Sequence, residues 1–446
     1  MKQKLTALYT SAQTQAIDRY AIEELGIQGS SLMSRAGHSA FELLGERWPE
    51  AQQIVIFCGG GNNGGDGYVV AALAHEAGRN VELRHLKSPE RLKGDSLAAY
   101  EWAVRAGVPM APYQSGELIV GDLIVDALLG TGLAGNVHDD FYKAILEINR
   151  SNLPVLSIDI PSGLNGDSGA VMGAAVEASL TITYIGIKQG MLTAAGKDLC
   201  GELLFDDLGL PDEAYENMTP VAEWNSFDSF PARPQRSQNS HKGDFGHLLI
   251  IGGNRGMGGA VRIAAEAAAH MGAGLITVAT HRENLTAIQV ARPEVMVHAI
   301  DSAADLEPLL ERANTIVIGP GLGKDRWAEE IFERTIQCDC PLLIDADGLN
   351  LLATSGLMDL ELPAEDPIIE QLNPKRWLLT PHPGEAARLL GIGSDEVQND
   401  RFDSVTKLAD RYNATVVLKG AGTLVASNGI LTGVCSHGNP GMASGG

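Results

Sequence analysis

Cysteine is scarce in this chain, and its spacing shows no disulfide framework and no zinc site. The cysteines are odd in number and include no CxxC pair: Cys58, Cys200, Cys338, Cys340 and Cys435. Such usage indicates a reducing compartment, because structural disulfides persist only where it is oxidising. Residues 1–22 lack the apolar core of a signal peptide, and no apolar run is long enough to cross a bilayer. We therefore expect a cytoplasmic protein without a membrane partner.

Basic residues are also in deficit. The chain has 33 Lys and Arg against 56 Asp and Glu, a formal net charge of −23. This balance argues against a nucleic-acid partner, since binding to a phosphate backbone depends on neutralisation by Lys and Arg. An acidic protein can still hold a nucleotide where backbone amides, a helix N-terminus or a bound cation supply a local positive field.

Aromatic residues make up only 5% of the chain, whereas glycine is abundant, with 52 residues among 446. The glycines cluster at the ends of continuous apolar runs, which indicates phosphate-type loops on parallel strands. The runs in the first half are 54–58, 81–86, 122–130, 155–160 and 180–186, and those in the second half are 247–253, 275–280, 315–321, 341–348, 377–385 and 415–423. Runs that are apolar on both faces, separated by amphipathic helices such as 94–106, predict parallel sheets covered on both sides.

The length of the chain predicts two or three domains. Two α/β series are separated by residues 223–240, a polar stretch that contains proline and has no periodicity. We therefore expect two tandem domains, 1–225 and 226–446, each a mainly parallel sheet covered by helices. The first begins with a helix over residues 11–25 in which Ser11 is the N-cap, followed by a helix from Ser31 to about Arg47.

The segment GGGNNGGDG after the first apolar run predicts a ligand loop. Its glycines allow backbone N–H groups to converge on an anion at the start of a helix, and Asn62, Asn63 and Asp66 add polar side chains. A tight turn without a ligand is the alternative, which the length of the loop and its two amides disfavour. The segment does not match a Walker loop, because no GK[ST] follows.

Two further strand ends bring carboxylates to the same edge of the sheet. Asp126 ends the run DLIVDALLG, and Asp159 and Ser162 follow the run VLSIDI. Two carboxylates, an Asn and a Ser hydroxyl are able to form an oxygen cage for a cation, which would help an acidic protein hold a phosphate. The alternative is that each Asp only caps the loop that follows it.

In the second half, four glycine-containing segments stand at strand ends: GPGLG (319–323), DADGLN (345–350), TPHPGE (380–385) and KGAGT (419–423). His382 lies between two prolines, which favours a contact role. Lys419 and the amides after it are similar to a phosphate clamp. His241 and Lys242 are as readily explained as solvated linker residues. The last residues, GNPGMASGG, form a glycine loop that should lead into a helix, so we expect a truncated chain.

Together these motifs resemble the bifunctional NAD(P)H-hydrate repair family. GGNNGGDGYV, DALLGTGL and DIPSGL resemble its epimerase domain, which is Rossmann-like. HKGDFG, GPGLG, DADGLN, TPHPGE, KGAGT and GNPGMASGG resemble its ADP-dependent dehydratase domain, which is ribokinase-like. The resemblance covers nearly the whole chain. It implies an isomerase and lyase that repairs hydrated NADH and NADPH (NADHX and NADPHX): the first domain interconverts the R and S hydrates, and the second dehydrates the S form while consuming a nucleotide.

The resemblance also implies residue roles. K⁺ would bind at Asn63, Asp126 and Ser162, and ADP or ATP with Mg²⁺ at Lys419, Gly420, Ala421, Gly422 and Thr423. The substrate would contact Asn62, Asn63, Gly64, Gly65, Asp66, Gly130, Thr131, Gly132, Leu133, Ala134, Gly135, Asn136, Ala260, Gly321 and His382. We expect Asp159 to be the catalytic residue of epimerisation, as a carboxyl whose pKa is raised in a crevice of low dielectric.

This sequence departs from the family at its end, because the family's last loop continues into an Asp that is the expected base of the dehydratase. We therefore expect the dehydratase activity to be lost from the chain as printed. Two other readings remain open: the second domain as a kinase for a small or vitamin-like alcohol, and the first as a non-enzymatic binding module. We also expect a homo-oligomer.

Overall fold

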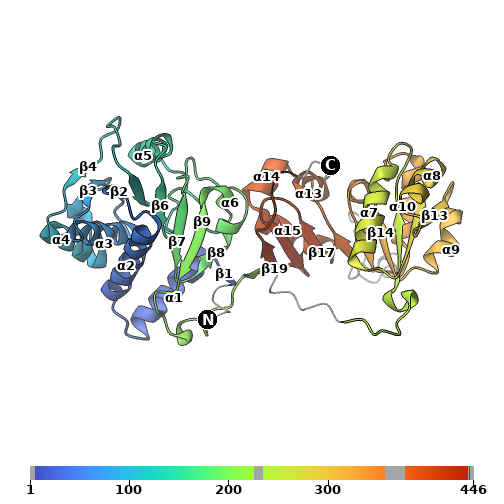
Figure 1. Cartoon of the computed structure of the whole chain (residues 1–446), viewed down its shortest axis with the longest axis horizontal. Coiled ribbons are helices and arrows are strands. Elements are labelled where there is room, and N and C mark those ends of the chain that lie inside the picture. The colour runs from blue at the N-terminus through green and yellow to red at the C-terminus, as the bar shows by residue number, and fades with distance from the viewer. Residues whose placement is uncertain (1–5, 226–234, 357–376, 440, 442–446) are drawn as a thin grey trace. The chain divides into compact units, whose positions relative to one another are not determined.

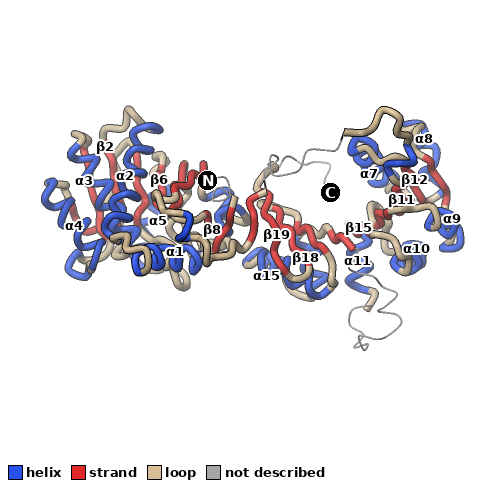
Figure 2. The backbone as a smooth tube through the Cα atoms, turned by 90° about the horizontal axis from the view of Figure 1, so that it is seen from below, coloured by secondary structure: helices blue, strands red, loops and turns tan. Residues whose placement is uncertain are grey.

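The structure is a computed structural model that describes residues 6–225, 235–356, 377–439 and 441. The chain forms two compact units (Figure 1). The first contains the residues up to Ser226 together with the described residues from Val434 onward, and the second extends from Phe227 to Gly433. Strands lie between helices in both units (Figure 2). Among the described residues, no helix combines the length and apolar character needed to span a bilayer.

The first unit is built on a seven-stranded sheet in the order β4-β3-β2-β5-β6-β7-β9, and all neighbouring strands are parallel. Its strands are β2 (Gln53–Cys58), β3 (Asn80–His85), β4 (Met110–Pro112), β5 (Leu123–Ala127), β6 (Val155–Ile158), β7 (Leu180–Tyr184) and β9 (Glu202–Asp206). Its helices are α1 (Ser11–Glu23), α2 (Gly29–Arg47), α3 (Asn62–Glu76), α4 (Gly94–Ala106), α5 (Asp139–Arg150) and α6 (Gly196–Leu199).

Helices cover both faces of this sheet. Ile54 and Ile56 of β2 belong to the core formed with α2, α3 and α4, whereas Val55 and Phe57 belong to the core formed with α5. Successive side chains of a strand point to opposite faces, so a strand covered on both sides must be apolar throughout. This explains the continuous apolar runs and confirms the predicted fold class.

Three further strands of the same unit lie outside the seven-stranded sheet: β1 (Ala7–Tyr9), β8 (Ile187–Lys188) and β10 (Ala222–Trp224). Strand β1 pairs in parallel with β8, with Tyr9 opposite Lys188, and antiparallel with β10. The backbone N–H of Asn225 donates to the carbonyl of Val434 over 2.7 Å. The described residues from Val434 onward therefore group with the first unit, whereas the sequence placed them in the second domain.

The second unit has the strand order β13-β12-β11-β14-β15-β16-β17-β18, parallel up to β17 and antiparallel between β17 and β18. Its strands are β11 (His247–Ile251), β12 (Leu275–Thr280), β13 (Met296–Ala299), β14 (Thr315–Ile318), β15 (Leu342–Ile344), β16 (Trp377–Leu379), β17 (Thr415–Leu418) and β18 (Thr423–Ser427), with β19 (Ile430–Cys435) after them. Its helices are α7 (Gly258–Met271), α8 (Leu285–Ala291), α9 (Glu307–Leu310), α10 (Arg326–Ile336), α11 (Asp347–Thr354), α13 (Pro383–Leu390), α14 (Ser394–Asn399) and α15 (Arg401–Arg411).

The first helix begins one residue from its predicted start. Thr10 is the N-cap, because its hydroxyl accepts from the backbone N–H of Gln13 and the Gln13 side chain accepts from that of Thr10. Ser11 is the first helical residue, and its backbone N–H donates to Asp167 over 2.6 Å. Residues 226–234 of the predicted linker lie outside the described residues.

Candidate functional site

A cavity of about 680 Å³ lies in the first unit where β2, β3, β5, β6 and β7 end. Ligands of open parallel sheets bind outside the carboxyl ends of the strands, and the volume falls within the range of small-molecule sites. The residues that line it are Thr14, Gln15, Asp18, Ile22, Gly29, Leu32, Met33, Ala36, Gly60, Gly61, Asn62, Asn63, Asp66, Lys87, Asp95, Leu128, Leu129, Gly130, Thr131, Gly132, Leu133, Ala134, Phe141, Asp159, Tyr184, Ile185, Lys188 and Leu208.

The predicted glycine loop forms the start of α3, with Gly61 as an N-cap that has no side-chain hydrogen bond. A Cβ at Gly64 would overlap the carbonyl oxygen of Gly59, so only glycine lets the helix start this close to the strand. Asn63 is 8% exposed, and neither polar atom of its side chain has a hydrogen-bond partner. Because buried amides are nearly always hydrogen-bonded, this side chain is suited to a ligand.

Asp126 of β5 is fully buried, and neither it nor Ser162 is among the residues that line the cavity. Its carboxylate accepts from the Ser162 hydroxyl (2.6 Å), the Ser162 backbone N–H (2.9 Å), the Ser157 hydroxyl (2.8 Å) and the Leu128 backbone N–H (3.3 Å). Burial raises the pKa of Asp126, and these hydrogen bonds oppose that effect. No Lys, Arg or His of the described chain forms an ion pair with it. A buried carboxylate that is fully hydrogen-bonded yet has no cationic side chain is a reasonable ligand for a metal cation.

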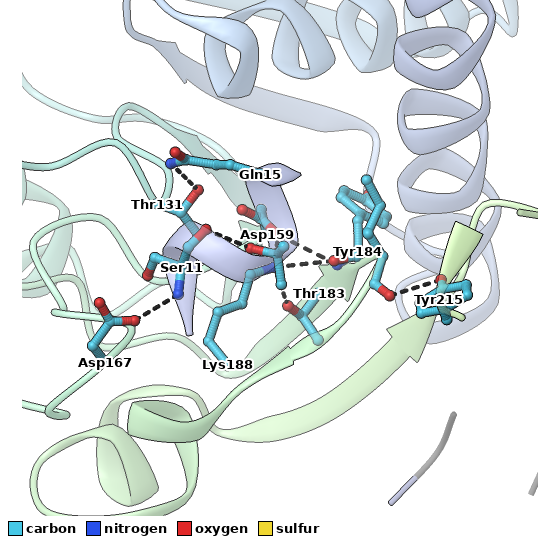
Figure 3. Close-up of polar contacts among 11 residues, drawn as sticks. Ser11, Gln15, Thr131, Asp159, Asp167, Thr183, Tyr184, Lys188 and Tyr215 are labelled. Carbon is cyan, nitrogen blue, oxygen red and sulfur yellow. Dashed lines mark hydrogen bonds and ion pairs between the residues drawn. The ribbon is translucent and has the colours of Figure 1, made fainter. Parts of the chain in front are cut away.

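Asp159 directly follows β6 and forms an ion pair with Lys188 (Figure 3). The ammonium of Lys188 also donates to the Thr183 hydroxyl (2.9 Å) and the Tyr184 carbonyl (3.1 Å), so its three N–H groups all have partners. The Lys188 side chain is 1% exposed and that of Asp159 is 18% exposed. The other oxygen of Asp159, Oδ2, lies beside Gly130, since a Cβ built there would be 3.8 Å away.

Two further carboxyl groups line the cavity. Burial raises the pKa of Asp66 well above its usual range, and the charges of Asp159 and Asp18 raise it further. Burial likewise raises the pKa of Asp18, with smaller contributions from Asp159 and Asp95. The cavity therefore combines an ion-paired carboxylate with two carboxyl groups whose pKa is raised by burial.

This arrangement includes a partner that the sequence did not predict. Asp159 lies in the cavity, as expected, and has a buried cationic partner in Lys188. The carboxyl group whose pKa burial raises well above its usual range is that of Asp66. Lys188, Asp18 and Tyr184 were not predicted. A lysine directly after an apolar, glycine-containing strand was the signal for Lys188.

The other predicted residues of the first unit occupy two kinds of position. Asn62 and Gly130–Ala134 line the cavity, and the side chain of Gln15 donates to the Thr131 hydroxyl over 3.3 Å (Figure 3). Gly64 and Gly65 lie within α3, away from the lining. Gly135 and Asn136 follow in the loop but do not line the cavity.

In the second unit, Lys419 directly follows β17, and its ammonium lies 2.7 Å from Asp345 Oδ1 and 3.9 Å from Glu385 Oε2. Glu385 also lies 3.4 Å from the ring of His382, which is half exposed and forms the N-cap of α13. The structure thus brings His382 and Lys419 together through one buried carboxylate.

The backbone of the Lys419–Thr423 loop rests on a buried arginine that was not predicted. The Arg401 guanidinium is 1% exposed and donates to the carbonyls of Leu418, Lys419 and Gly422 over 3.2–3.3 Å. Burial lowers the pKa of Arg401 to about 10. Gly420 has φ +140° and lies against the guanidinium, so a side chain there would displace it.

Ala260 and Gly321 also lie together. Gly321 follows β14 with φ +60°, and its carbonyl accepts from the backbone N–H of Asn254 over 2.6 Å. A Cβ at Gly321 would be 3.1 Å from the Cβ of Ala260 at the start of α7. Of the terminal loop 438–446, residues 440 and 442–446 lie outside the described residues. Within the described chain, no group of three or more His, Cys, Asp or Glu side chains is arranged to hold a metal ion.

Comparisons with known proteins match both halves. Residues 29–190 match the family described as YjeF-related protein N-terminus, and residues 248–446 match NAD(P)H-hydrate dehydratase. The bifunctional NAD(P)H-hydrate repair enzyme Nnr of Coxiella burnetii is 46% identical over 445 residues, which is 99% of this chain and 88% of that protein. The enzyme of the same name from Escherichia coli is 40% identical over 96% of this chain and 80% of its own length.

Among solved structures, the ADP/ATP-dependent NAD(P)H-hydrate dehydratase of Bacillus subtilis, co-crystallised with ATP/Mg²⁺, is 26% identical over 48% of this chain and 72% of that chain, with a TM-score of 0.38. The identity to the Coxiella and Escherichia proteins extends across both units, so neither a kinase for a small alcohol nor a non-enzymatic binding module is favoured. The chain therefore belongs to the family of bifunctional NAD(P)H-hydrate repair enzymes, with an epimerase unit and an NAD(P)H-hydrate dehydratase unit in one polypeptide.

Proposed function

We propose that the cavity of the first unit is the site at which R and S NADHX and NADPHX interconvert, and that Asp159 transfers the proton. The observation that carries this proposal is the Asp159–Lys188 pair. Lys188 engages Oδ1 of Asp159, whereas Oδ2 lies beside Gly130 in the cavity wall. The carboxylate is thus held in one orientation with one oxygen available to a ligand.

Inversion at the hydroxyl-bearing ring carbon requires one bond to that carbon to break and to re-form on the other face, while a proton is taken up and returned. A positioned carboxylate performs both proton transfers if it is within hydrogen-bond reach of the reacting group. Lys188 keeps Asp159 oriented and has no N–H left for the substrate. Burial raises the pKa of Asp66 and of Asp18, which line the same cavity.

The test is the rate at which purified S-NADPHX equilibrates with the R form, followed by chromatography. Asp159→Asn should reduce the enzymatic rate to that of buffer alone, because the amide cannot accept the proton. Asp140→Asn is the matched control, since Asp140 pairs with Lys143 on the exposed start of α5. Equilibration by Asp159→Asn at the wild-type rate would refute the role of this residue.

We further propose that K⁺ binds at Asn63, Asp126 and Ser162. The donor chemistry fits, because the Asn63 amide has no partner and Asp126 is a buried carboxylate without a cationic side chain. Leu129 connects these residues. Its backbone N–H and carbonyl both contact the Ser162 hydroxyl. The residue after it, Gly130, lies against Asn63. When bound, K⁺ would supply positive charge beneath the phosphate-bearing substrate.

The test is epimerase activity in K⁺, Na⁺ and choline buffers. We expect wild type to depend on K⁺ and Asp126→Asn to be inactive in all three. Equal activity of wild type in K⁺ and choline would exclude the cation site.

For the second unit we propose a dehydratase site in which Lys419, Gly420, Ala421, Gly422 and Thr423 hold ADP or ATP with Mg²⁺, and Ala260, Gly321 and His382 contact the hydrate. Support comes from the partly exposed ammonium of Lys419 and from the cluster that it forms with Glu385 and His382. Lys419→Ala should weaken ADP binding at least tenfold by calorimetry, and unchanged affinity would contradict the assignment.

The remaining proposals concern the whole chain. We propose that residues 1–225 and 226–446 are the epimerase and dehydratase domains and that the protein is cytoplasmic and self-associates. The cysteine usage supports the location. Light scattering and cell fractionation test these points: a monomeric mass or an extracellular location would refute them.

A further inference from the structure

The cavity of the first unit has two cationic side chains in its lining, Lys188 and Lys87. Lys188 is fully engaged by Asp159, Thr183 and the Tyr184 carbonyl. Lys87 has no such role. No carboxylate of the described chain lies within ion-pairing distance of its ammonium, although the cavity contains several Asp side chains. The proposed proton transfer leaves this lysine unexplained.

Lys87 lies over the glycine loop. Its Cγ and Cβ would be 3.0 and 3.1 Å from a Cβ built on Gly60, so the aliphatic part of the lysine rests on the backbone of that residue. Its ammonium lies 5.2 Å from the centre of the Phe141 ring, which also lines the cavity. The charge is therefore held at the wall of the cavity, beside the loop that leads into α3.

The start of α3 is the second half of this arrangement. The helix has 15 residues, and its N-cap, Gly61, offers no side chain to the free N–H groups of the first turn. Those groups and the helix dipole favour an anion at this position. Asn63, in the same turn, is only 8% exposed, and neither polar atom of its side chain has a hydrogen-bond partner.

We infer that Lys87 and the first turn of α3 bind the diphosphate of NADHX and NADPHX, and that Lys87 is a specificity residue that selects the dinucleotide. This inference rests on the proposed epimerase function of the cavity. A charge-assisted hydrogen bond from an ammonium, added to backbone N–H groups, is a common way to bind phosphate oxygens.

The spacing favours the diphosphate over the 2′-phosphate of NADPHX. Asn63 lies against Gly130, which is also beside Asp159 Oδ2. From Gly60 to Asn63 the chain advances three residues, which span at most about 10 Å. One ribose separates the reacting ring from the diphosphate, whereas the 2′-phosphate lies at the far end of the dinucleotide. The phosphate group of the substrate that can lie this close to the reacting ring is therefore the diphosphate.

The experiment compares Lys87→Met and Lys87→Arg with Lys143→Met in the full chain. Lys143 is an exposed lysine of α5 that pairs with Asp140 and does not line the cavity. Initial rates of epimerisation are measured with NADHX, NADPHX and the hydrate of reduced nicotinamide mononucleotide, which has a single phosphate. We expect Lys87→Met to raise KM about tenfold for both dinucleotides with kcat within about twofold of wild type. Lys87→Arg should restore most of the affinity.

Lys87→Met should raise KM less for the mononucleotide hydrate than for the dinucleotides, because the mononucleotide contains one phosphate in place of the diphosphate. The dependence of KM on ionic strength should also be weaker in Lys87→Met than in wild type or Lys143→Met. An unchanged KM for Lys87→Met would overturn the inference, and so would a rise confined to NADPHX, which would assign the 2′-phosphate to this lysine. Absence of epimerisation by wild type would instead refute the proposed function.

Discussion

The ion pair between Asp159 and Lys188 can be dissected by removing its charges one at a time and together. The variants are Asp159→Asn, Lys188→Met and the double substitution. Asp159 has φ +66°, a left-handed conformation that asparagine tolerates better than most residues. Methionine is unbranched and flexible, so it can fill the channel that the lysine stem occupies. Each change therefore removes a charge with little change of shape.

The exposed fractions of the two side chains set the expected order of the effects. Removing one member of a buried pair costs about 3–5 kcal/mol, since the other charge is left without compensation. The Lys188 side chain is 1% exposed and that of Asp159 is 18% exposed. Asp159→Asn leaves the more deeply buried charge alone, so we expect its cost near the upper end of that range. Lys188→Met leaves a carboxylate that cavity water can hydrate, so we expect about 3 kcal/mol.

The double variant has no uncompensated charge, so its cost should fall below the sum of the single costs by about 2 kcal/mol or more. Hydrogen exchange measured by mass spectrometry on peptides from residues 155–188 reports the free energy of local opening, and peptides of the second unit provide an internal control. Costs that add within about 0.5 kcal/mol would refute the coupling. A larger cost for Lys188→Met than for Asp159→Asn would refute the reasoning from burial.

Three further predictions concern other parts of the two sites. Burial raises the pKa of Asp66, so the folded chain keeps a proton that the unfolded chain releases near about pH 4. Stability should therefore fall as pH rises above that value. Asp66→Asn should flatten this part of a Tm–pH profile, and an unchanged slope would contradict the prediction. Gly64→Ala should destabilise the first unit by about 1–3 kcal/mol, measured by hydrogen exchange, because the added Cβ would overlap backbone atoms. Gly61→Ala has open space around its Cβ and should cost less than about 1 kcal/mol. Equal costs for the two variants would contradict this prediction. Arg401→Met should release the loop after Lys419 and weaken ADP binding about tenfold by calorimetry, and wild-type affinity would show that the loop is held by other contacts.

Much of the fold follows from local sequence. A strand such as Gln53–Cys58 is covered by helices on both faces, and its continuous apolar character reports that burial directly. The convergence of Asn63 and Asp159 on one cavity was also predictable, because the carboxyl ends of parallel strands share an edge. The cap of the first helix was missed by one residue because Thr10 and Ser11 are both good N-caps, and only the reciprocal bond with Gln13 distinguishes them.

The partners of the candidate site residues were harder to predict. Lys188 reaches Asp159 only because the chain turns back after β7, and charge pairing between distant segments leaves no periodic signal in a sequence. Arg401 begins an amphipathic helix, where an arginine is ordinarily solvated. Arg401 can be buried because it donates to backbone carbonyls of the loop between β17 and β18. The sequence alone does not predict that contact.

The pairing of β1 with β8 has a consequence for synthesis of the chain. Strand β1 is made first, yet its partners are Ile187–Lys188 and Ala222–Trp224. At about 5–20 residues per second, a ribosome would take about 10–40 s to deliver β8 after β1. During that interval the edge of β1 stays open to other strands, and Lys188 cannot reach Asp159. The cavity of the first unit is therefore completed late in translation, after β8 has been made and has paired with β1.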